Sequence, residues 1–221
     1  MIEISASVLG VDKEKANRTF YDLEVSKINY FHIDVMDGKF VEKNTLDYMK
    51  DYANTIYHIS NLGLDVHLMV QDIESIMEDY LDFNPKMLTF HIEESKTEER
   101  TKRIIDRIKE NGSKVGIAIS PDTSIEEVKK YLNIVHMVLI MTVVPGKGGQ
   151  KLIPETLKKV KELKEYIDKN NIDIDIEVDG GINDITAKDA INAGANILVV
   201  GNYLILANNY SEAIKKIKES K

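Results

Sequence analysis

YFHIDVM, residues 30–36, has the composition of a buried β-strand but carries polar groups on one face. Its aromatic and aliphatic residues favour a strand. Residues two apart share a face of a strand, so His32, Asp34 and Met36 point one way while Ile33 and Val35 point the other. Burying an unpartnered polar group costs roughly 2–7 kcal/mol. The polar row therefore indicates either a self-satisfied His–Asp pair or a functional site.

Short apolar runs of this kind alternate with longer amphipathic stretches, for example 47–56, 75–83, 98–110 and 154–169. Strand–helix alternation predicts parallel strands joined by right-handed crossovers, and eight such units predict a closed (β/α)8 TIM barrel. A doubly wound open sheet is the alternative, but the segment after the first run is a poor match to its glycine-rich turn. The eight runs are IEISASVL (2–9), YFHIDVM (30–36), LDVHLMV (64–70), MLTFHIE (87–93), KVGIAIS (114–120), HMVLIMTV (136–143), DIDIEVDG (173–180) and ILVVGN (197–202).

The whole-chain composition fits one barrel domain over residues 1–221. The net charge is −8 and no basic stripe is present, which argues against a nucleic acid partner. There are no cysteines, so disulfides and thiolate metal sites are excluded. We find no signal peptide pattern and no apolar run of membrane-spanning length. We therefore expect a cytoplasmic protein without a membrane partner.

The polar pattern of the opening strand recurs in two other runs. In DVHLMV (65–70), His67 shares a face with Met69, and EVDGG (177–181) places Asp179 at a strand end. In a barrel these residues converge with His32 and Asp34 at the carboxyl ends of the strands. Two imidazoles and two carboxylates form a ligand set for a divalent metal, which suits Zn²⁺ and could also accept Fe²⁺, Mn²⁺ or Co²⁺. Asp37, of opposite parity, is expected to bond to the backbone of its own turn.

Three glycine-bearing turns follow the last three strands: TVVPGKGGQ (142–150), DGGIND (179–184) and VGNY (200–203). Loops in these positions of a barrel commonly bind phosphate through backbone N–H groups, which glycine allows to approach closely. Any one of them could be an ordinary turn, but three at one edge favour a phosphate site. Lys147 could add a positive charge there or point to solvent.

A divalent metal beside a phosphate site suggests a small phosphorylated substrate. Asp34 and Asp179 would approach the pocket from nearly opposite sides, because their strands lie three steps apart around the ring. If a 2-keto sugar phosphate chelated the metal through its C2 and C3 oxygens, one aspartate could remove the C3 proton and the other could return a proton to the opposite face. The metal would stabilise the intermediate enediolate.

At the level of these motifs, the chain resembles the ribulose-phosphate 3-epimerase family from Ser5 to about Ile214. The resemblance implies a (β/α)8 barrel of the ribulose-phosphate-binding type that interconverts D-ribulose 5-phosphate and D-xylulose 5-phosphate with a divalent metal. It implies His32, Asp34, His67 and Asp179 as metal ligands, with Asp34 and Asp179 as the acid/base pair. His91 and Glu93 would support the ligands from behind. The implied substrate contacts are Ser7, Met36, His67, Met69, Met141, Gly146, Lys147, Gly148, Gly149, Gly180, Gly181, Gly201 and Asn202. Each methionine could equally be barrel packing.

The chain departs from the family pattern beside the substrate. Glu42-Lys43 stands where the family has Pro-Asn, Lys147 where it has an aromatic residue, and Asn202 where it has serine. These departures leave a longer ketose, such as D-allulose 6-phosphate, as an alternative substrate. A metal-dependent sugar-phosphate lyase and a non-catalytic sugar-phosphate-binding barrel also stay open. We expect a ketose phosphate as the partner and a homo-oligomer as the assembly.

Overall fold

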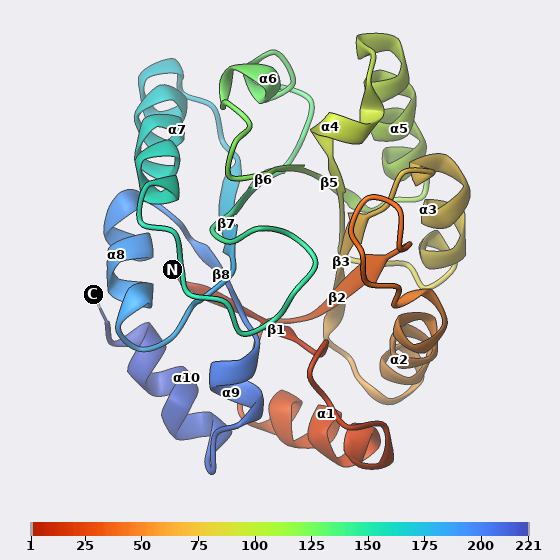
Figure 1. Ribbon diagram of the computed structural model, residues 1–221, viewed down its shortest axis with the longest axis vertical. Coiled ribbons are helices and arrows are strands. Elements are labelled where there is room, and N and C mark those ends of the chain that lie inside the picture. The colour runs from red at the N-terminus through yellow and green to blue at the C-terminus, as the bar shows by residue number, and fades with distance from the viewer. Residues whose placement is uncertain (1, 221) are drawn as a thin grey trace.

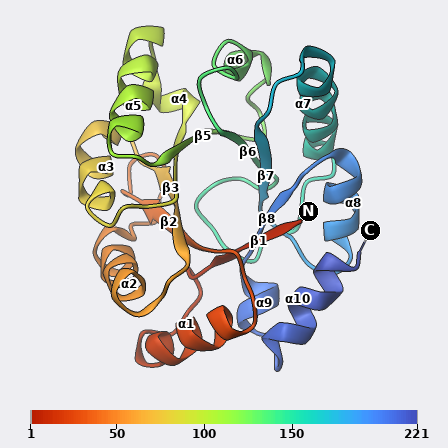
Figure 2. The same ribbon diagram turned by 180° about the vertical axis from the view of Figure 1, so that it is seen from behind.

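A computed structural model describes residues 2–220, so the expected domain over 1–221 extends one residue beyond them at each end. Eight parallel strands form a closed barrel in sequence order, with β8 paired to β1. Figure 1 looks down this barrel, and Figure 2 shows it from behind. The strands are β1 (Glu3–Ser7), β2 (Tyr30–Met36), β3 (Gly63–Met69), β4 (Met87–His91), β5 (Lys114–Ile119), β6 (Met137–Met141), β7 (Asp175–Asp179) and β8 (Ile197–Val200). The prediction of a (β/α)8 barrel is confirmed.

Helices surround the barrel in both views (Figures 1 and 2). Seven of the eight predicted apolar runs contain a whole strand, and β3 begins one residue before its run at 64–70. The helices predicted at 47–56, 75–83, 98–110 and 154–169 are also present, with ends that differ by up to three residues. The helices are α1 (Ala16–Val25), α2 (Leu46–Ile59), α3 (Ile73–Leu81), α4 (Ile92–Ser95), α5 (Glu98–Glu110), α6 (Glu126–Lys129), α7 (Thr156–Asn170), α8 (Thr186–Ala193), α9 (Asn202–Ile205) and α10 (Tyr210–Lys218), with a 3-10 turn at Lys13–Lys15.

Within residues 2–220, most of the buried apolar residues fall into two clusters, as the alternation along the strands predicts. Ile33 and Val35 belong to the large cluster that packs the outside of the barrel against the helices. A smaller cluster, which includes Met137, Leu139 and Met141, fills the inside of the barrel. The period-two pattern of each strand therefore assigns one set of side chains to the helices and the other to the interior.

Helix α5 shows how the amphipathic stretches form. The side chain of Thr97 accepts a hydrogen bond from the backbone N–H of Arg100 and caps the first turn. Ile104, Ile105 and Ile108 are buried against the barrel, while Lys and Glu pairs occupy the exposed side. Burying each isoleucine contributes roughly 1.5–3 kcal/mol. A charged residue at position 104 would therefore detach this helix from the sheet.

The sequence predicted the turn at Asp37 correctly, but it did not predict where strand β4 ends. Asp37 does bond to the backbone of its own turn, because Oδ1 accepts from the N–H groups of Lys39 and Phe40. Its Oδ2 accepts from Gln71 as well, which ties the β2–α2 loop to the end of β3. Strand β4, however, ends at His91, two residues before the predicted end of that run. The chain turns into α4 there, which directs Glu93 towards the loop after β5.

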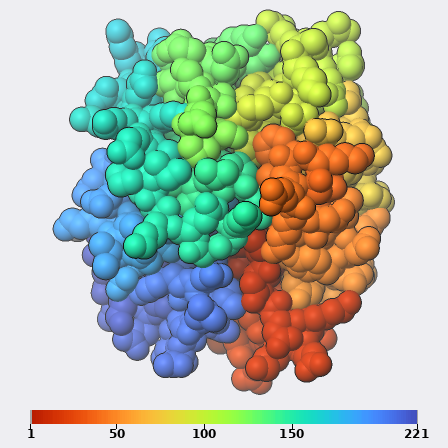
Figure 3. All heavy atoms as spheres, viewed as in Figure 1, coloured from red at the N-terminus to blue at the C-terminus, as the bar shows by residue number. Residues whose placement is uncertain are grey.

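The carboxyl ends of the strands form the face seen in Figure 1. On this face the β6–α7 segment (teal) lies beside the β2–α2 segment (orange), and Figure 3 shows both as the surface over the barrel mouth. A Cβ on Gly146 would lie 2.9 Å from Cβ of Val41, so the two segments are in close contact. Within residues 2–220, no helix combines the length and apolarity needed to span a membrane.

Candidate active site

The four predicted metal ligands converge inside the mouth of the barrel. Each offers one ligand atom, and these atoms all lie within 4.8 Å of one another. Oδ1 of Asp34 lies 3.4 Å from Nε2 of His32 and 3.6 Å from Nδ1 of His67. Oδ2 of Asp179 lies 3.8 Å and 3.7 Å from the same two nitrogens. Strand register produces this geometry, because Asp34 pairs with His67 across β2 and β3.

The unpartnered polar atoms of these residues test whether a metal fits. Among the buried side-chain atoms of residues 2–220, Nε2 of His32 and Nδ1 of His67 have no hydrogen-bond partner. Both histidines are fully buried, so each orphaned nitrogen would cost free energy unless something else contacts it. These are the nitrogens that face the two carboxylates. The site thus offers two imidazole lone pairs and two carboxylate oxygens, a donor set that fits a divalent cation.

The charges of the site favour protons on the imidazoles when nothing else occupies it. Burial opposes a charge on His32, but the carboxylates of Asp65 and Asp34 raise its pKa well above the usual value. Burial would also raise the pKa of Asp34, but His32 and His67 hold it well below its usual range. A metal ion and protons therefore compete for the same atoms, as is general for metal sites built from histidine.

Two buried carboxylates under the site were not predicted from the sequence. Asp65 accepts a hydrogen bond from Oγ of Ser5 at 2.6 Å and lies 2.7 Å from Nδ1 of His32. A carboxylate behind a histidine ligand fixes the ring and leaves the other nitrogen free. Glu177 is fully buried beside Asp65, and burial raises the pKa of its carboxyl well above the usual value. The sequence did carry a signal for both residues. Asp65 lies two residues before His67 and Glu177 two residues before Asp179, so each shares a strand face with a predicted ligand.

Ser7 and Thr45 hold Asp34 in place. Oγ of Ser7 donates to Oδ2 of Asp34 at 2.8 Å, and Oγ1 of Thr45 donates to its backbone oxygen at 2.7 Å. Asp34 thus uses one carboxylate oxygen for Ser7 and presents the other to the two histidines. The predicted contact residue Ser7 lies in the site, and Thr45 supports the site without any sequence signal of its own.

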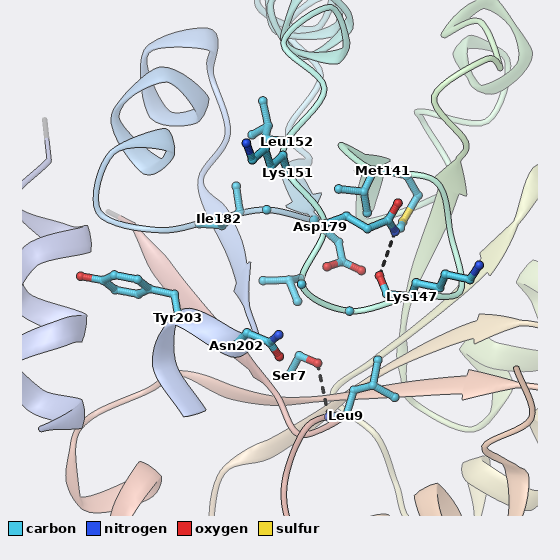
Figure 4. A pocket seen from close by; sticks show the side chains of 18 of the residues that line it. Ser7, Leu9, Met141, Lys147, Lys151, Leu152, Asp179, Ile182, Asn202 and Tyr203 are labelled. Carbon is cyan, nitrogen blue, oxygen red and sulfur yellow. Dashed lines mark hydrogen bonds between the residues drawn. The ribbon is translucent and has the colours of Figure 1, made fainter. Parts of the chain in front are cut away.

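A cavity of about 860 Å³ opens above this centre. Figure 4 shows the Asp179 carboxylate pointing into it, with Ser7 and Asn202 on the facing side. All predicted substrate contacts line the cavity except His67, which is buried beneath it. Those that line it are Ser7, Met36, Met69, Met141, Gly146, Lys147, Gly148, Gly149, Gly180, Gly181, Gly201 and Asn202. The sequence did not predict several further wall residues, among them Leu9, Gln150, Leu152 and Asn183.

The turn after β7 requires its two glycines. Gly180 and Gly181 have φ of +121° and +69°, values that L side chains rarely adopt. A Cβ on Gly181 would lie 2.3 Å from the backbone nitrogen of Leu152. Thr142 and Thr186 fasten the turn, since their hydroxyls donate to the backbone oxygens of Gly180 and Gly181. The turn and the β6–α7 segment therefore form one continuous wall of backbone.

The sequence profile of the Ribulose-phosphate 3 epimerase family matches residues 3–205. A ribulose-phosphate 3-epimerase from Methanocaldococcus jannaschii is 36% identical over 220 residues, covering 100% of this chain and 91% of the relative. One from Bacillus subtilis is 36% identical over 222 residues and is covered completely, as is this chain. The chain belongs to the ribulose-phosphate 3-epimerase family. The prediction of an isomerase of the epimerase type is thereby confirmed.

Solved structures agree on the fold. A 3-hexulose-6-phosphate synthase from Salmonella typhimurium has a TM-score of 0.67 at 16% identity, covering 99% of this chain and 98% of the other. A KGPDC from Streptococcus mutans has a TM-score of 0.66 at 11% identity, covering 100% of this chain and 97% of the other. At such low identity, these likenesses show only that the family's barrel is shared.

The positions that depart from the family pattern lie at the rim of the cavity. The Lys147 side chain is 74% exposed, extends away from the centre in Figure 4 and lies 3.8 Å from the carboxylate of Glu42. The backbone oxygen of Lys147 accepts a hydrogen bond from the side-chain amide of Gln150. Lys43 lines the cavity, and Asn202 stands beside Gly149. None of these side chains is among the four residues of the metal cluster.

Proposed function

We propose that this protein is a metal-dependent epimerase that inverts C3 of a ketose phosphate and converts D-ribulose 5-phosphate to D-xylulose 5-phosphate. The observation that carries the proposal is the placement of Asp34 and Asp179. They come from strands three positions apart around the ring, yet each has an oxygen within 3.4–3.8 Å of the same two imidazole nitrogens. Membership of the family supports the substrate class.

His32, Asp34, His67 and Asp179 would hold one divalent ion, and this mixed nitrogen and oxygen set suits Zn²⁺ well. When bound, the ion would supply Lewis-acid stabilisation of the negative charge that develops on the substrate oxygens. The fully buried histidines belong to rigid strands, so they offer their lone pairs without rearrangement of the loops.

The two aspartates divide the proton transfers. Starting from D-ribulose 5-phosphate, the Asp34 carboxylate removes the C3 proton, and the C–H electron pair becomes the C2–C3 double bond of an enediolate. Protonated Asp179 then returns a proton to the opposite face of C3, which restores the C2 carbonyl and inverts the centre. Each general acid–base step of this kind contributes roughly 10²–10⁴-fold. The hydrogen bond from Ser7 fixes the orientation of Asp34 during the transfer.

The cavity walls supply binding. Backbone N–H groups of the glycine turns at 146–149, 180–181 and 201–202 would hold the substrate phosphate. Met36, Met69 and Met141 line the cavity near the metal cluster and present polarisable, apolar surface. Such surface excludes water from the reacting carbons without offering a competing proton donor.

Solvent exchange in D₂O tests the proposal. The wild type should incorporate deuterium at C3 and form D-xylulose 5-phosphate from D-ribulose 5-phosphate. Asp34→Asn and Asp179→Asn should each stop epimerisation, with metal content measured in parallel. With metal retained, each variant should exchange the C3 proton of one epimer only, because each keeps one of the two bases. Asp106→Asn removes an exposed carboxylate of α5 that does not line the cavity, and it serves as the control that retains epimerisation.

The outcomes separate the competing functions. Cleavage of the substrate into fragments would indicate a lyase, and absence of both exchange and cleavage would indicate a binding protein. A higher kcat/KM for D-allulose 6-phosphate than for D-ribulose 5-phosphate would reassign the substrate to a hexulose phosphate. Normal epimerisation by metal-loaded Asp34→Asn or Asp179→Asn protein would refute the two-base mechanism.

A further inference from the structure

A chain of hydrogen bonds runs from His67 away from the metal cluster. Nε2 of His67 lies 3.0 Å from Nε2 of His91, and Nδ1 of His91 lies 3.1 Å from Oε2 of Glu93. Both histidines are fully buried, and their rings stack at 5.1 Å between centroids with an angle of 26°. The carboxylate behind this ligand is therefore separated from it by a second imidazole. His32, by contrast, has Asp65 directly behind it.

The far end of the chain is fixed by the loop after β5. Oε1 of Glu93 accepts from the backbone N–H of Ser120 at 2.7 Å and from Oγ1 of Thr123 at 2.5 Å. Burial would raise the pKa of Glu93, but His91 and, to a smaller extent, Thr123 and Ser120 lower it to about 2. Lys159 holds the loop itself, because its ammonium group donates to the backbone oxygen of Thr123 at 2.6 Å. Glu93 is thus an anchored carboxylate, which can only accept hydrogen bonds.

The acceptor at one end sets the direction of every bond in the chain. Since Glu93 accepts, Nδ1 of His91 carries a proton and donates. A neutral imidazole carries one proton, so Nε2 of His91 must accept. Nε2 of His67 is then the donor, which leaves a lone pair on Nδ1 of His67. That nitrogen is the buried, unpartnered atom that faces Asp34 and Asp179.

We propose that Glu93 is a positioning residue that acts through His91 to keep the ring proton of His67 on Nε2 and its Nδ1 lone pair directed at the metal position. This inference rests on the metal site of the proposed function. In this arrangement the carboxylate of Glu93 determines the tautomer of His67, although His91 lies between them in the hydrogen-bond chain. The two histidine ligands therefore present opposite nitrogens, Nε2 from His32 and Nδ1 from His67, each selected by its own carboxylate.

Glu93→Gln is the sharpest perturbation, because it keeps the shape of the side chain and reverses the direction of the hydrogen bonds from residue 93 to His67. The N–H of Ser120 still requires an acceptor, so the amide oxygen occupies the Oε1 position and the NH₂ group faces His91. Nδ1 of His91 must then accept, its Nε2 donates, and the proton of His67 is displaced to Nδ1, where it blocks the metal. Zn²⁺ affinity, measured by competition with a chromogenic chelator, should fall roughly 10–100-fold.

Thr123→Val is the matched control. It removes one hydrogen bond to Oε1 of Glu93 while Ser120 remains, so the direction of the chain is unchanged. Its Zn²⁺ dissociation constant should stay close to that of the wild type. A loss equal to that of Glu93→Gln would show that the cluster is only structural, and would overturn the proposal.

Nitrogen-15 spectra read the tautomer directly. His91 should carry its proton on Nδ1 in the zinc-loaded wild type, where Nε2 of His67 donates to it, and on Nε2 in metal-free Glu93→Gln. A wild-type His91 protonated on Nε2 would overturn the relay even if Glu93→Gln failed to fold. Unchanged Zn²⁺ affinity in Glu93→Gln would also overturn it while leaving the metal site intact. A wild-type protein that does not bind Zn²⁺ would instead refute the proposed function, and the relay with it.

Discussion

Replacing Gly181 with alanine should destabilise the protein and weaken substrate binding together. Gly181 has φ of +69°, and an added Cβ would lie 2.3 Å from the nitrogen and 2.8 Å from Cα of Leu152. Both of these atoms belong to the backbone of the β6–α7 segment, so no side-chain rotation relieves the contact. The substitution must therefore displace one of the two walls of the cavity.

The magnitude follows from three contributions. A left-handed conformation costs a non-glycine residue about 1–2 kcal/mol. Overpacking adds about 1–3 kcal/mol. The reduced freedom of the unfolded chain offsets about 0.4–1 kcal/mol. The net loss is about 1–5 kcal/mol, which lowers the Tm of a chain of this size by roughly 2–20 °C.

Gly112→Ala provides the matched control for this measurement. Gly112 has φ of +88°, but nothing lies within 4 Å of the position that its Cβ would occupy. It should show only the left-handed cost less the unfolded-chain offset, a net loss of about 1 kcal/mol. Thermal unfolding followed by circular dichroism gives the stabilities, and kinetics on D-ribulose 5-phosphate gives KM. Gly181→Ala should raise KM while Gly112→Ala should not. Equal losses of stability in the two variants, or an unchanged KM for Gly181→Ala, would refute the steric argument.

Two further predictions concern the metal and pH. Chelation should abolish turnover without unfolding the chain, because the large core between barrel and helices does not include the proposed ligands. Activity and circular dichroism after chelation test this. Full activity in metal-free protein would contradict it. The carboxylate of Glu93, with its pKa lowered to about 2, should stabilise the fold fully above its ordinary pKa and progressively less as the pH falls from about 4.5 towards 2. The stability difference between wild type and Glu93→Gln should therefore shrink by roughly 1.4 kcal/mol between pH 7 and pH 3.5 in urea titrations, and a constant difference would show that this pKa is not lowered.

The strands and the four-residue cluster were predictable because both depend on short-range periodicity. Parity along β2 and β3 determines which side chains face the interior, and parallel strands in a barrel bring their carboxyl ends to one face. The same parity could have identified Asp65 and Glu177, but a charged residue deep in a barrel is plausible only once its partners are known. The contacts of Asp65 with His32 and Ser5 explain why its carboxylate can be buried there.

The loops were less predictable, because tertiary contacts decide their course. His91 and Glu93 lie two apart, which predicts a shared face if the strand continues. The chain instead enters α4, and Glu93 reaches the loop after β5. The direction of Lys147 was also open in the sequence. It depends on the position of Glu42, more than a hundred residues earlier, and on the bonds from Gln150 to the backbone oxygens of Val144 and Lys147.

The closed ring has a consequence for how the protein acquires its activity. His32, Asp34 and His67 lie on neighbouring strands, but Asp179 reaches them only across the seam where β8 pairs with β1. That seam joins the two ends of the chain and is the pairing of longest sequence separation, the kind that slows folding most. The proposed four-ligand site is therefore incomplete in any intermediate with an open seam. The rate at which tight metal binding appears during refolding would therefore measure the rate of ring closure, independently of helix formation.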